Sequence, residues 1–264
     1  MKINNLEAFK TKIGSGKLAL GMVVTLADPA ISELAGDVGM DFTWIDMEHG
    51  PLSIETALGH VMALRGTGAA PFIRVPGNDP FIIKPVLELA PAGVIIPMVN
   101  SAAEAEAAVK ACRYPPRGIR GCGPRRGMGF GLTRFSDYLD ASEHDPLVIV
   151  QIESIAAVKD LKKIVAVEGI GSICIGPYDL SGSMGKLGDT EAADVQAAID
   201  ESCACARQAG MMIGSVSGSD PASIRRWKAR GANWLAVCSD YNVLAGATKN
   251  ALEQAGSAIP RKRA

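Results

Sequence analysis

Eight short apolar runs, separated by longer stretches with helical periodicity, constrain the fold of this chain more than any other feature. The runs are rich in β-branched residues and almost continuously apolar, as in GVIIPMV and LVIVQI. Strands of this kind are covered on both faces, which is typical of parallel sheets whose strands alternate with helices. The predicted strands are Leu18–Thr25, Phe42–Asp46, Pro71–Val75, Gly93–Val99, Leu147–Ile152, Ser172–Ile175, Met211–Val216 and Trp234–Val237.

The stretches between these runs carry helix signals. SIETALGHVMALRG, SAAEAEAAVKACRY, IAAVKDLKKIVAVEG and DVQAAIDESCACARQAG are Ala-rich and amphipathic, and several end near a glycine. Asp28, Asp79 and Asp220 each precede a proline just after a strand, so we expect them to cap helices.

Eight strand–helix units in 264 residues favour one (β/α)₈ barrel domain spanning residues 1–264. An open doubly wound sheet is the alternative. No G-x-G-x-x-G follows the first strand, which disfavours that alternative as a dinucleotide-binding fold.

Composition excludes several classes of partner. Twenty-seven basic and 28 acidic residues leave no general electrostatic reason to bind nucleic acid or an anionic membrane. Without an apolar stretch of signal-peptide or membrane-spanning length, we expect a soluble cytoplasmic protein. The six cysteines include no Cys-x-x-Cys, which suits reduced thiols, and Cys203 and Cys205 do not face each other on a helix.

Catalytic groups of barrel enzymes lie at the carboxyl ends of the strands. The polar residues at those ends are Asp46, Glu48, His49, Arg74, Glu153, Asp179 and Asp240.

Glu153 and Asp179 follow neighbouring strands, so their carboxylates can converge. Two carboxylates without clustered His or Cys suit a hard divalent cation such as Mg²⁺ or Mn²⁺. In the alternative interpretation, the two acids bind no cation, and each only caps the turn or helix that follows it.

The segment from Asp46 to His49 offers a base, His49, with a carboxylate to orient its ring. His60 lies inside an amphipathic helix and His144 in a polar stretch, so we expect packing or surface roles for both. Arg74 is an unusual residue for an apolar strand. It can contact a substrate carboxylate or a developing oxyanion, or it can form an internal ion pair with Asp46 or Glu48.

No predicted strand contains a lysine, apart from Lys17 at the edge of the first, which disfavours a Schiff-base aldolase. If the chain is a carbon–carbon lyase, a metal is the expected electron sink. The Gly/Arg-rich segment 115–137 lies between the fourth helix and the fifth strand. We expect it on the active-site side as a functional or interface loop, or else as a solvated insertion.

Several long motifs resemble one family. IDMEHGPLSIET, FIRVPGNDPFIIKPVLELAPAGVIIPMVN, VIVQIES and VEGIGSICIGPYDLSGSMG, in this order over nearly the whole chain, are similar to the HpcH/HpaI aldolases. These are class II, metal-dependent 2-oxo acid aldolases. The resemblance implies a (β/α)₈ barrel whose last helix is exchanged between paired subunits, with the dimers assembled as a hexamer.

The resemblance also implies roles for individual residues. Glu153 and Asp179 would hold a divalent cation, Mg²⁺ or Mn²⁺ first, with Co²⁺ or Zn²⁺ as further options. His49 would act as the base, directly or through a bound water, with Asp46 orienting it, and Arg74 would contact the 2-oxo group. The backbone around Gly176 and Pro177 would lie against the substrate carboxylate.

The implied reaction is the reversible cleavage of a 4-hydroxy-2-oxo acid to pyruvate and an aldehyde. Decarboxylation of an oxaloacetate-like acid is a second enzymatic interpretation, and a non-catalytic oligomeric scaffold is a third. Charges clustered at a barrel mouth count against the scaffold. CGPRRGMGFG departs from the family pattern where the aldehyde is expected, so Arg125 and Arg126 could recognise an anionic aldehyde or serve a subunit interface.

Overall fold

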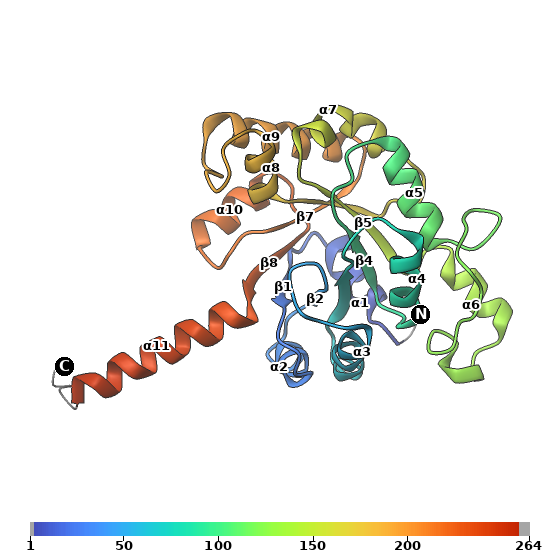
Figure 1. Ribbon diagram of the computed structural model, residues 1–264, viewed down its shortest axis with the longest axis horizontal. Helices are drawn as coiled ribbons and strands as arrows, with labels where there is room; N and C mark the ends of the chain where they lie inside the picture. Colours follow the sequence, from blue (N-terminus) through green and yellow to red (C-terminus); the bar gives the residue numbers. More distant parts are fainter. Residues whose placement is uncertain (1–2, 259–264) are drawn as a thin grey trace.

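The computed structural model, which describes residues 3–258, is a closed barrel of eight parallel strands (Figure 1). Strand order follows the sequence, and β8 pairs with β1 to close the sheet. The predicted strands and the barrel are confirmed, and closure excludes the open sheet. The strands are β1 (Ala19–Val24), β2 (Phe42–Asp46), β3 (Ala70–Arg74), β4 (Gly93–Ile96), β5 (Leu147–Ile152), β6 (Ser172–Ile175), β7 (Met212–Val216) and β8 (Trp234–Ser239).

Helices surround the barrel, and α1 precedes the first strand. They are α1 (Leu6–Gly14), α2 (Ala30–Asp37), α3 (Ile54–Ala63), α4 (Pro80–Glu88), α5 (Ala102–Cys112), α6 (Phe135–Ser142), α7 (Ile155–Ile164), α8 (Pro177–Ser183), α9 (Ala193–Gln208), α10 (Pro221–Ala229) and α11 (Asp240–Ala258). A 3₁₀ turn spans Gly129–Gly131. Each of the four predicted amphipathic segments contains a helix. Asp79 and Asp220 are confirmed as helix caps, since each accepts a backbone N–H from the first turn of its helix. Asp28 accepts the N–H of Ala30, but the cap position of α2 is Pro29.

Aromatic rings fill the amino-terminal half of the barrel. Phe9 of α1 packs edge-on against Phe72 with ring centroids 4.8 Å apart, and Phe42 stacks on Phe72 at 5.2 Å. Trp234 meets both strand phenylalanines, and a Cβ on Gly214 would lie 1.9 Å from its ring. Because this end is closed by packed rings, polar chemistry is confined to the carboxyl ends of the strands.

The Gly/Arg-rich segment 115–137 lies at the opposite end of the barrel from the carboxyl ends of the strands. It connects α5 to β5, so it returns to the amino-terminal end of the sheet, beside α6 (Figure 1). Arg126 is buried there and donates to the carbonyl of Leu89 at the end of α4, at 2.7 Å, whereas Arg125 is exposed. The prediction that this segment sits beside its own active site is wrong, because helix-to-strand connections cannot reach the mouth.

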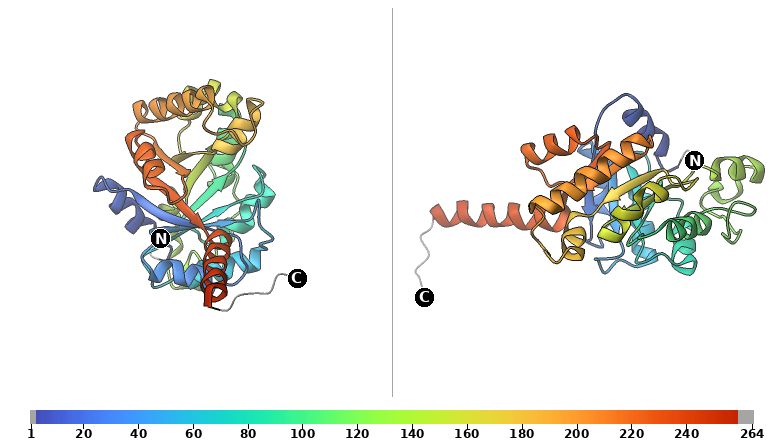
Figure 2. Two further views of the ribbon diagram at one scale, coloured as in Figure 1. Left: turned by 90° about the vertical axis from the view of Figure 1, so that its left-hand side faces the viewer. Right: turned by 90° about the horizontal axis from the view of Figure 1, so that it is seen from above.

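Helix α11 leaves the barrel and extends away from it (Figures 1 and 2). Its apolar side chains Tyr241, Val243, Leu244 and Leu252 are each at least half exposed. Within the described residues, no helix is both long and apolar enough to cross a membrane.

His60 is fully buried in α3, as expected for a packing residue, with its Nδ1 2.9 Å from the hydroxyl of Ser32 on α2. His144 is exposed. Burial lowers the pKa of His60, because the charged imidazolium loses its hydration in the helix interface. The folded protein therefore favours neutral His60, whereas the unfolded chain takes up the proton near the ordinary pKa of about 6.5.

We predict that the contribution of His60 to the free energy of unfolding falls as the pH drops from about 6.5 towards 5, because protons then stabilise the unfolded chain. Urea unfolding at pH 7.5 and 5.5 measures this loss, which His60→Gln should reduce. His144→Gln is the matched control and should keep the wild-type pH dependence. An unchanged pH dependence in His60→Gln would contradict the assignment.

Candidate active site

The carboxyl ends of the strands surround a cavity of about 1050 Å³. Its wall draws on residues from β2, β3, β5, β6 and β8 and from the loops that follow them. The seven residues to which the resemblance gave roles all line this one cavity: Asp46, His49, Arg74, Glu153, Gly176, Pro177 and Asp179. Glu48 and Asp240, which also follow strands, are not among its lining residues.

Arg74 is the buried cation of the site. Its Nε donates to Asp46 Oδ1 at 2.9 Å, and its Nη2 donates to the other oxygen of the same carboxylate. Nη1 lies 2.9 Å from Glu48 Oε2, and the guanidinium sits 5.0 Å above the ring of Trp44. Burial alone would lower the pKa of Arg74, but the hydrogen bonds and charge of Asp46, with Glu48, raise it. The predicted internal ion pair is confirmed, and it involves both acids.

Asp46 also organises the turn that carries His49. Its Oδ1 accepts the backbone N–H groups of Glu48 at 3.0 Å and His49 at 3.2 Å. The imidazole itself is 62% exposed, and its Nε2 lies 3.8 Å from Glu48 Oε2. The structure thus places Asp46 against the backbone of the His49 turn and Glu48 beside the ring.

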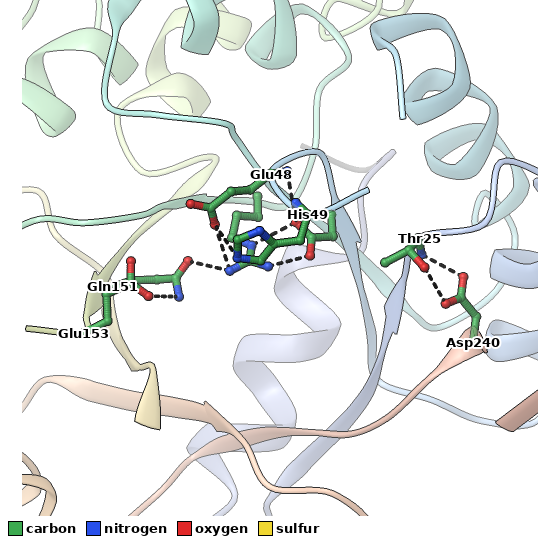
Figure 3. Close-up of polar contacts among 8 residues, drawn as sticks. Thr25, Glu48, His49, Gln151, Glu153 and Asp240 are labelled. Carbon is green, nitrogen blue, oxygen red and sulfur yellow. Dashed lines mark hydrogen bonds and ion pairs between the residues drawn. The ribbon is translucent and has the colours of Figure 1, made fainter. Parts of the chain in front are cut away.

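Glu153 is buried directly after β5, and each of its two carboxylate oxygens accepts one hydrogen bond. Its Oε1 accepts the N–H of Met98 at 2.7 Å, and its Oε2 accepts from Nε2 of Gln151 at 2.8 Å (Figure 3). Met98 has a positive φ of 53°, a strained conformation for a residue with a side chain. A Cβ on Gly176 would lie 2.7 Å from Oε2, so only glycine lets this backbone approach the carboxylate.

The alternative in which the two acids are helix caps is not what the structure shows. The cap of α7 is Ser154, whose hydroxyl accepts from Ala157 N–H. Asp179 lies in the first turn of α8, is exposed and lines the cavity, while the cap position of α8 is Gly176.

The charges around Glu153 are unbalanced towards the negative. Burial, together with the charges of Glu48 and Asp179, raises the pKa of Glu153 to about 7, against the opposing effects of the Met98 N–H and Arg74. Burial also raises the pKa of Glu48, despite the opposing charges of Arg74 and His49. Three acids thus act on one another across the cavity, and a bound cation would relieve their repulsion.

The donor set fits a hard divalent cation. Within residues 3–258, no three or more His, Cys, Asp or Glu side chains form a metal-binding cluster, so Glu153 and Asp179 would be a two-carboxylate set. Mg²⁺ is commonly bound in this way, through one or two carboxylates with waters and substrate oxygens. Asp179 is exposed to the cavity, whereas Glu153 is held in place by Met98 and Gln151.

Gln151 is the functional residue that the sequence reasoning missed. Its amide nitrogen holds Glu153, and its Oε1 lies 3.4 Å from Nη1 of Arg74 (Figure 3). The signal was present in LVIVQI, where one polar side chain interrupts an otherwise apolar strand.

Known proteins carry the same fold and sequence pattern. The sequence matches the family HpcH/HpaI aldolase/citrate lyase over residues 19–247. The chain belongs to the HpcH/HpaI aldolase/citrate lyase family. This confirms the resemblance seen in its motifs.

Two named relatives and one solved structure illustrate the similarity. The chain is 38% identical to the hydroxypyruvate/pyruvate aldolase of Roseovarius nubinhibens, covering 93% of this chain and 95% of that protein. It is 35% identical to the 4-hydroxy-2-oxo-heptane-1,7-dioate aldolase of Shigella sonnei, covering 92% of each. The crystal structure of a family member from Burkholderia cenocepacia superposes with a TM-score of 0.86 at 30% identity, covering 93% of this chain and 98% of that one.

We predict that Gln151→Leu weakens Mn²⁺ binding about 10- to 100-fold, because Glu153 loses the partner that orients it. Electron paramagnetic resonance of free Mn²⁺ in a titration measures the dissociation constant. Gln196→Leu is the matched control, since Gln196 lines the same cavity but bonds Thr190 and Arg230 instead. Equal dissociation constants for both variants would argue against this role of Gln151.

Proposed function

We propose that this chain is a metal-dependent carbon–carbon lyase that reversibly cleaves a 4-hydroxy-2-oxo acid to pyruvate and an aldehyde. One observation carries the proposal: a buried, doubly paired Arg74 shares a single cavity with Glu153 and Asp179 at the mouth of the barrel. Membership of an aldolase/citrate lyase family supports it. We further propose that residues 1–264 form one catalytic domain.

Glu153 and Asp179 would hold the divalent cation, which we propose to be Mg²⁺ or Mn²⁺. When bound, such a cation polarises the 2-oxo acid and stabilises negative charge on its 2-oxo oxygen as the carbon–carbon bond breaks. Gly176 and Pro177, which line the cavity, would form the wall against the substrate carboxylate.

Arg74 supplies fixed positive charge beside the 2-oxo group. Its Nε and Nη2 are committed to Asp46, so the guanidinium cannot rotate away as charge develops on the substrate. Glu48 and Gln151 lie at its remaining nitrogen, Nη1. A buried arginine is held in one orientation by these bonds, whereas a lysine has a flexible side chain with a single charged nitrogen.

His49 is the proposed base in the cleavage direction. Its ring is exposed to the cavity, and its Nε2 lies 3.8 Å from Glu48 Oε2. The imidazole would take the proton of the 4-hydroxyl group as the bond between C3 and C4 breaks. C4 then leaves as the aldehyde carbon, and the electron pair stays on C3 of the pyruvate part.

The aldehyde part of the substrate would meet a polar wall. The cavity continues towards α9 and α10 past side chains that carry hydroxyl, amide or guanidinium groups, namely Thr190, Gln196, Ser217, Ser223 and Arg226. Arg226 is held there by two 2.7 Å contacts to Glu191. We propose a small hydroxylated aldehyde, whose hydroxyl groups these polar side chains would hydrogen-bond.

The decisive experiment removes and restores the metal. We predict that chelator-treated protein loses pyruvate release from 4-hydroxy-2-oxo acids, and that Mg²⁺ or Mn²⁺ restores it more fully than Co²⁺ or Zn²⁺. Lactate dehydrogenase coupling measures the pyruvate. Activity that survives complete metal removal would contradict the proposal, and pyruvate release from oxaloacetate without any aldehyde product would favour a decarboxylase.

Two variants test the proposed base and the fixed positive charge in the same assay. His49→Ala and Arg74→Ala should each lower kcat/KM at least 100-fold, since a positioned base and a fixed charge contribute 10²- to 10³-fold each. His144→Ala, which changes an exposed histidine far from the cavity, should behave as wild type. A wild-type kcat/KM in His49→Ala would contradict the assignment of His49 as the base.

We also propose that the protein is a homo-oligomer, a hexamer built from three dimers, in which α11 packs on a second copy of the chain. Leu244 and Leu252 are 58% and 51% exposed on a helix that projects from its own barrel. Such an apolar face is unfavourable in water unless another surface covers it. We propose a second copy of the chain as the partner, and neither nucleic acid nor a membrane. We also propose a cytoplasmic location, which suits the six free cysteines.

We predict that the double variant Leu244→Glu/Leu252→Glu sediments as a smaller species than wild type, because charge on both leucines prevents the apolar face of α11 from being buried. Analytical ultracentrifugation measures the mass. Leu187→Glu places the same charge on an exposed leucine of the barrel and should leave the mass unchanged. A double variant with wild-type mass would contradict the role of α11.

A further inference from the structure

Asp240 is a buried carboxylate that the proposed reaction does not use. It lies where β8 ends and α11 begins, and it is only 4% exposed. Its Oδ2 accepts the N–H groups of Thr25 and Leu26, both at 2.7 Å. Its Oδ1 accepts the hydroxyl of Thr25 at 3.0 Å and the N–H of Tyr241 at 2.8 Å. One side chain thus ties the end of the last strand to the end of the first.

The segment it holds forms part of the cavity wall. Thr25 and Leu26 follow β1 and line the cavity, as does Tyr241 at the start of α11. Thr25 also reaches the neighbouring turn, since a Cβ on Gly50 would lie 3.4 Å from Thr25 Cβ. Gly50 directly follows His49 in the chain. In Figure 3, the pair Thr25–Asp240 accordingly lies on the opposite side of His49 from Gln151 and Glu153.

The turn that carries His49 is held from two sides. Within the turn, Glu48 Oε2 lies 2.9 Å from Nη1 of Arg74, and Met47 packs against the hydrophobic core. The N–H groups of Glu48 and His49 bond Asp46, and the N–H of Met47 bonds the carbonyl of Arg74. These contacts hold the turn from the side of β2 and β3. On its far side, next to His49, Thr25 lies close to the turn, since a Cβ added to Gly50 would be 3.4 Å from Thr25 Cβ and 3.6 Å from its Cα.

We propose that Asp240 and Thr25 form a latch, and that this latch positions His49 for catalysis. Asp240 fixes the backbone and hydroxyl of Thr25, and Thr25 in turn blocks outward movement of the chain at Gly50. A displacement of about 1 Å in a catalytic group can cost about 100-fold in rate, so a restraint of this kind acts on kcat. The inference rests on the proposed function for the role of His49.

The test compares two latch variants with two controls. Asp240→Asn puts an amide NH₂ in place of an oxygen that accepts either two N–H groups or one N–H and the Thr25 hydroxyl. Thr25→Val keeps the shape of the side chain but removes its hydroxyl. Thr25→Ser keeps the hydroxyl and loses only the methyl group. Asp41→Asn is the matched aspartate control, because Asp41 accepts the N–H of Leu20 at the other end of β1.

We expect Asp240→Asn and Thr25→Val to lower kcat for pyruvate release about 10- to 100-fold, with KM for the 2-oxo acid changed less than about 3-fold. Thr25→Ser should recover most of the wild-type kcat. Asp41→Asn should lower the melting temperature without this kcat effect. If Asp240→Asn does not fold, the comparison of kcat between Thr25→Val and Thr25→Ser tests the latch.

Hydrogen exchange of residues 46–50 gives a readout that needs no substrate. The amides of this turn should exchange faster in Asp240→Asn and Thr25→Val than in wild type or Asp41→Asn, each measured at the same interval below its melting temperature. If wild-type protein releases no pyruvate from any substrate, the proposed function fails. The latch is then tested by hydrogen exchange of residues 46–50 alone. Latch variants that match Asp41→Asn in both kcat and exchange would overturn the inference.

Discussion

The pairing of Arg74 with Asp46 and Glu48 is the interaction on which the rest of the site depends. A guanidinium buried between barrel strands must be matched by charge, since an unpaired buried cation is strongly destabilising. Asp46 meets that need and, with the same oxygen that accepts from Arg74 Nε, holds the turn that carries His49. The orientation of the cation and the path of the β2–α3 connection are therefore set together.

The aromatic packing beneath this pair explains why the chemistry lies where it does. Phe9, Phe42, Phe72 and Trp234 fill the amino-terminal half of the barrel, and Gly214 leaves room for the indole. The buried hydroxyl of Ser172 accepts the indole N–H of Trp234 in that layer. The charged side chains lie elsewhere. They gather above this layer, where Gln151 links Arg74 to Glu153 and where burial raises the pKa of Glu153 to about 7.

The architecture and the principal site residues could be predicted from the sequence because both depend on local patterns. Apolar β-branched runs mark strands covered on both faces, and the barrel rule then assigns Asp46, His49, Glu153 and Asp179 to one end of the sheet. The misplacement of segment 115–137 came from its composition, since Gly and Arg suggested a functional loop. Chain direction overrides composition, because a connection from a helix back to a strand starts from the other end of the barrel.

The sequence by itself determined the barrel, the family and the residue types at its mouth, because strand periodicity and motif spacing are written along the chain. Only the tertiary structure decided which partner each of these residues takes. Arg74 bonds two acids at once, Gln151 holds Glu153, and Asp240 bonds Thr25 across 215 residues of sequence. Such pairings depend on closure of β8 against β1 and on side-chain direction at strand ends, which no local pattern of residues encodes.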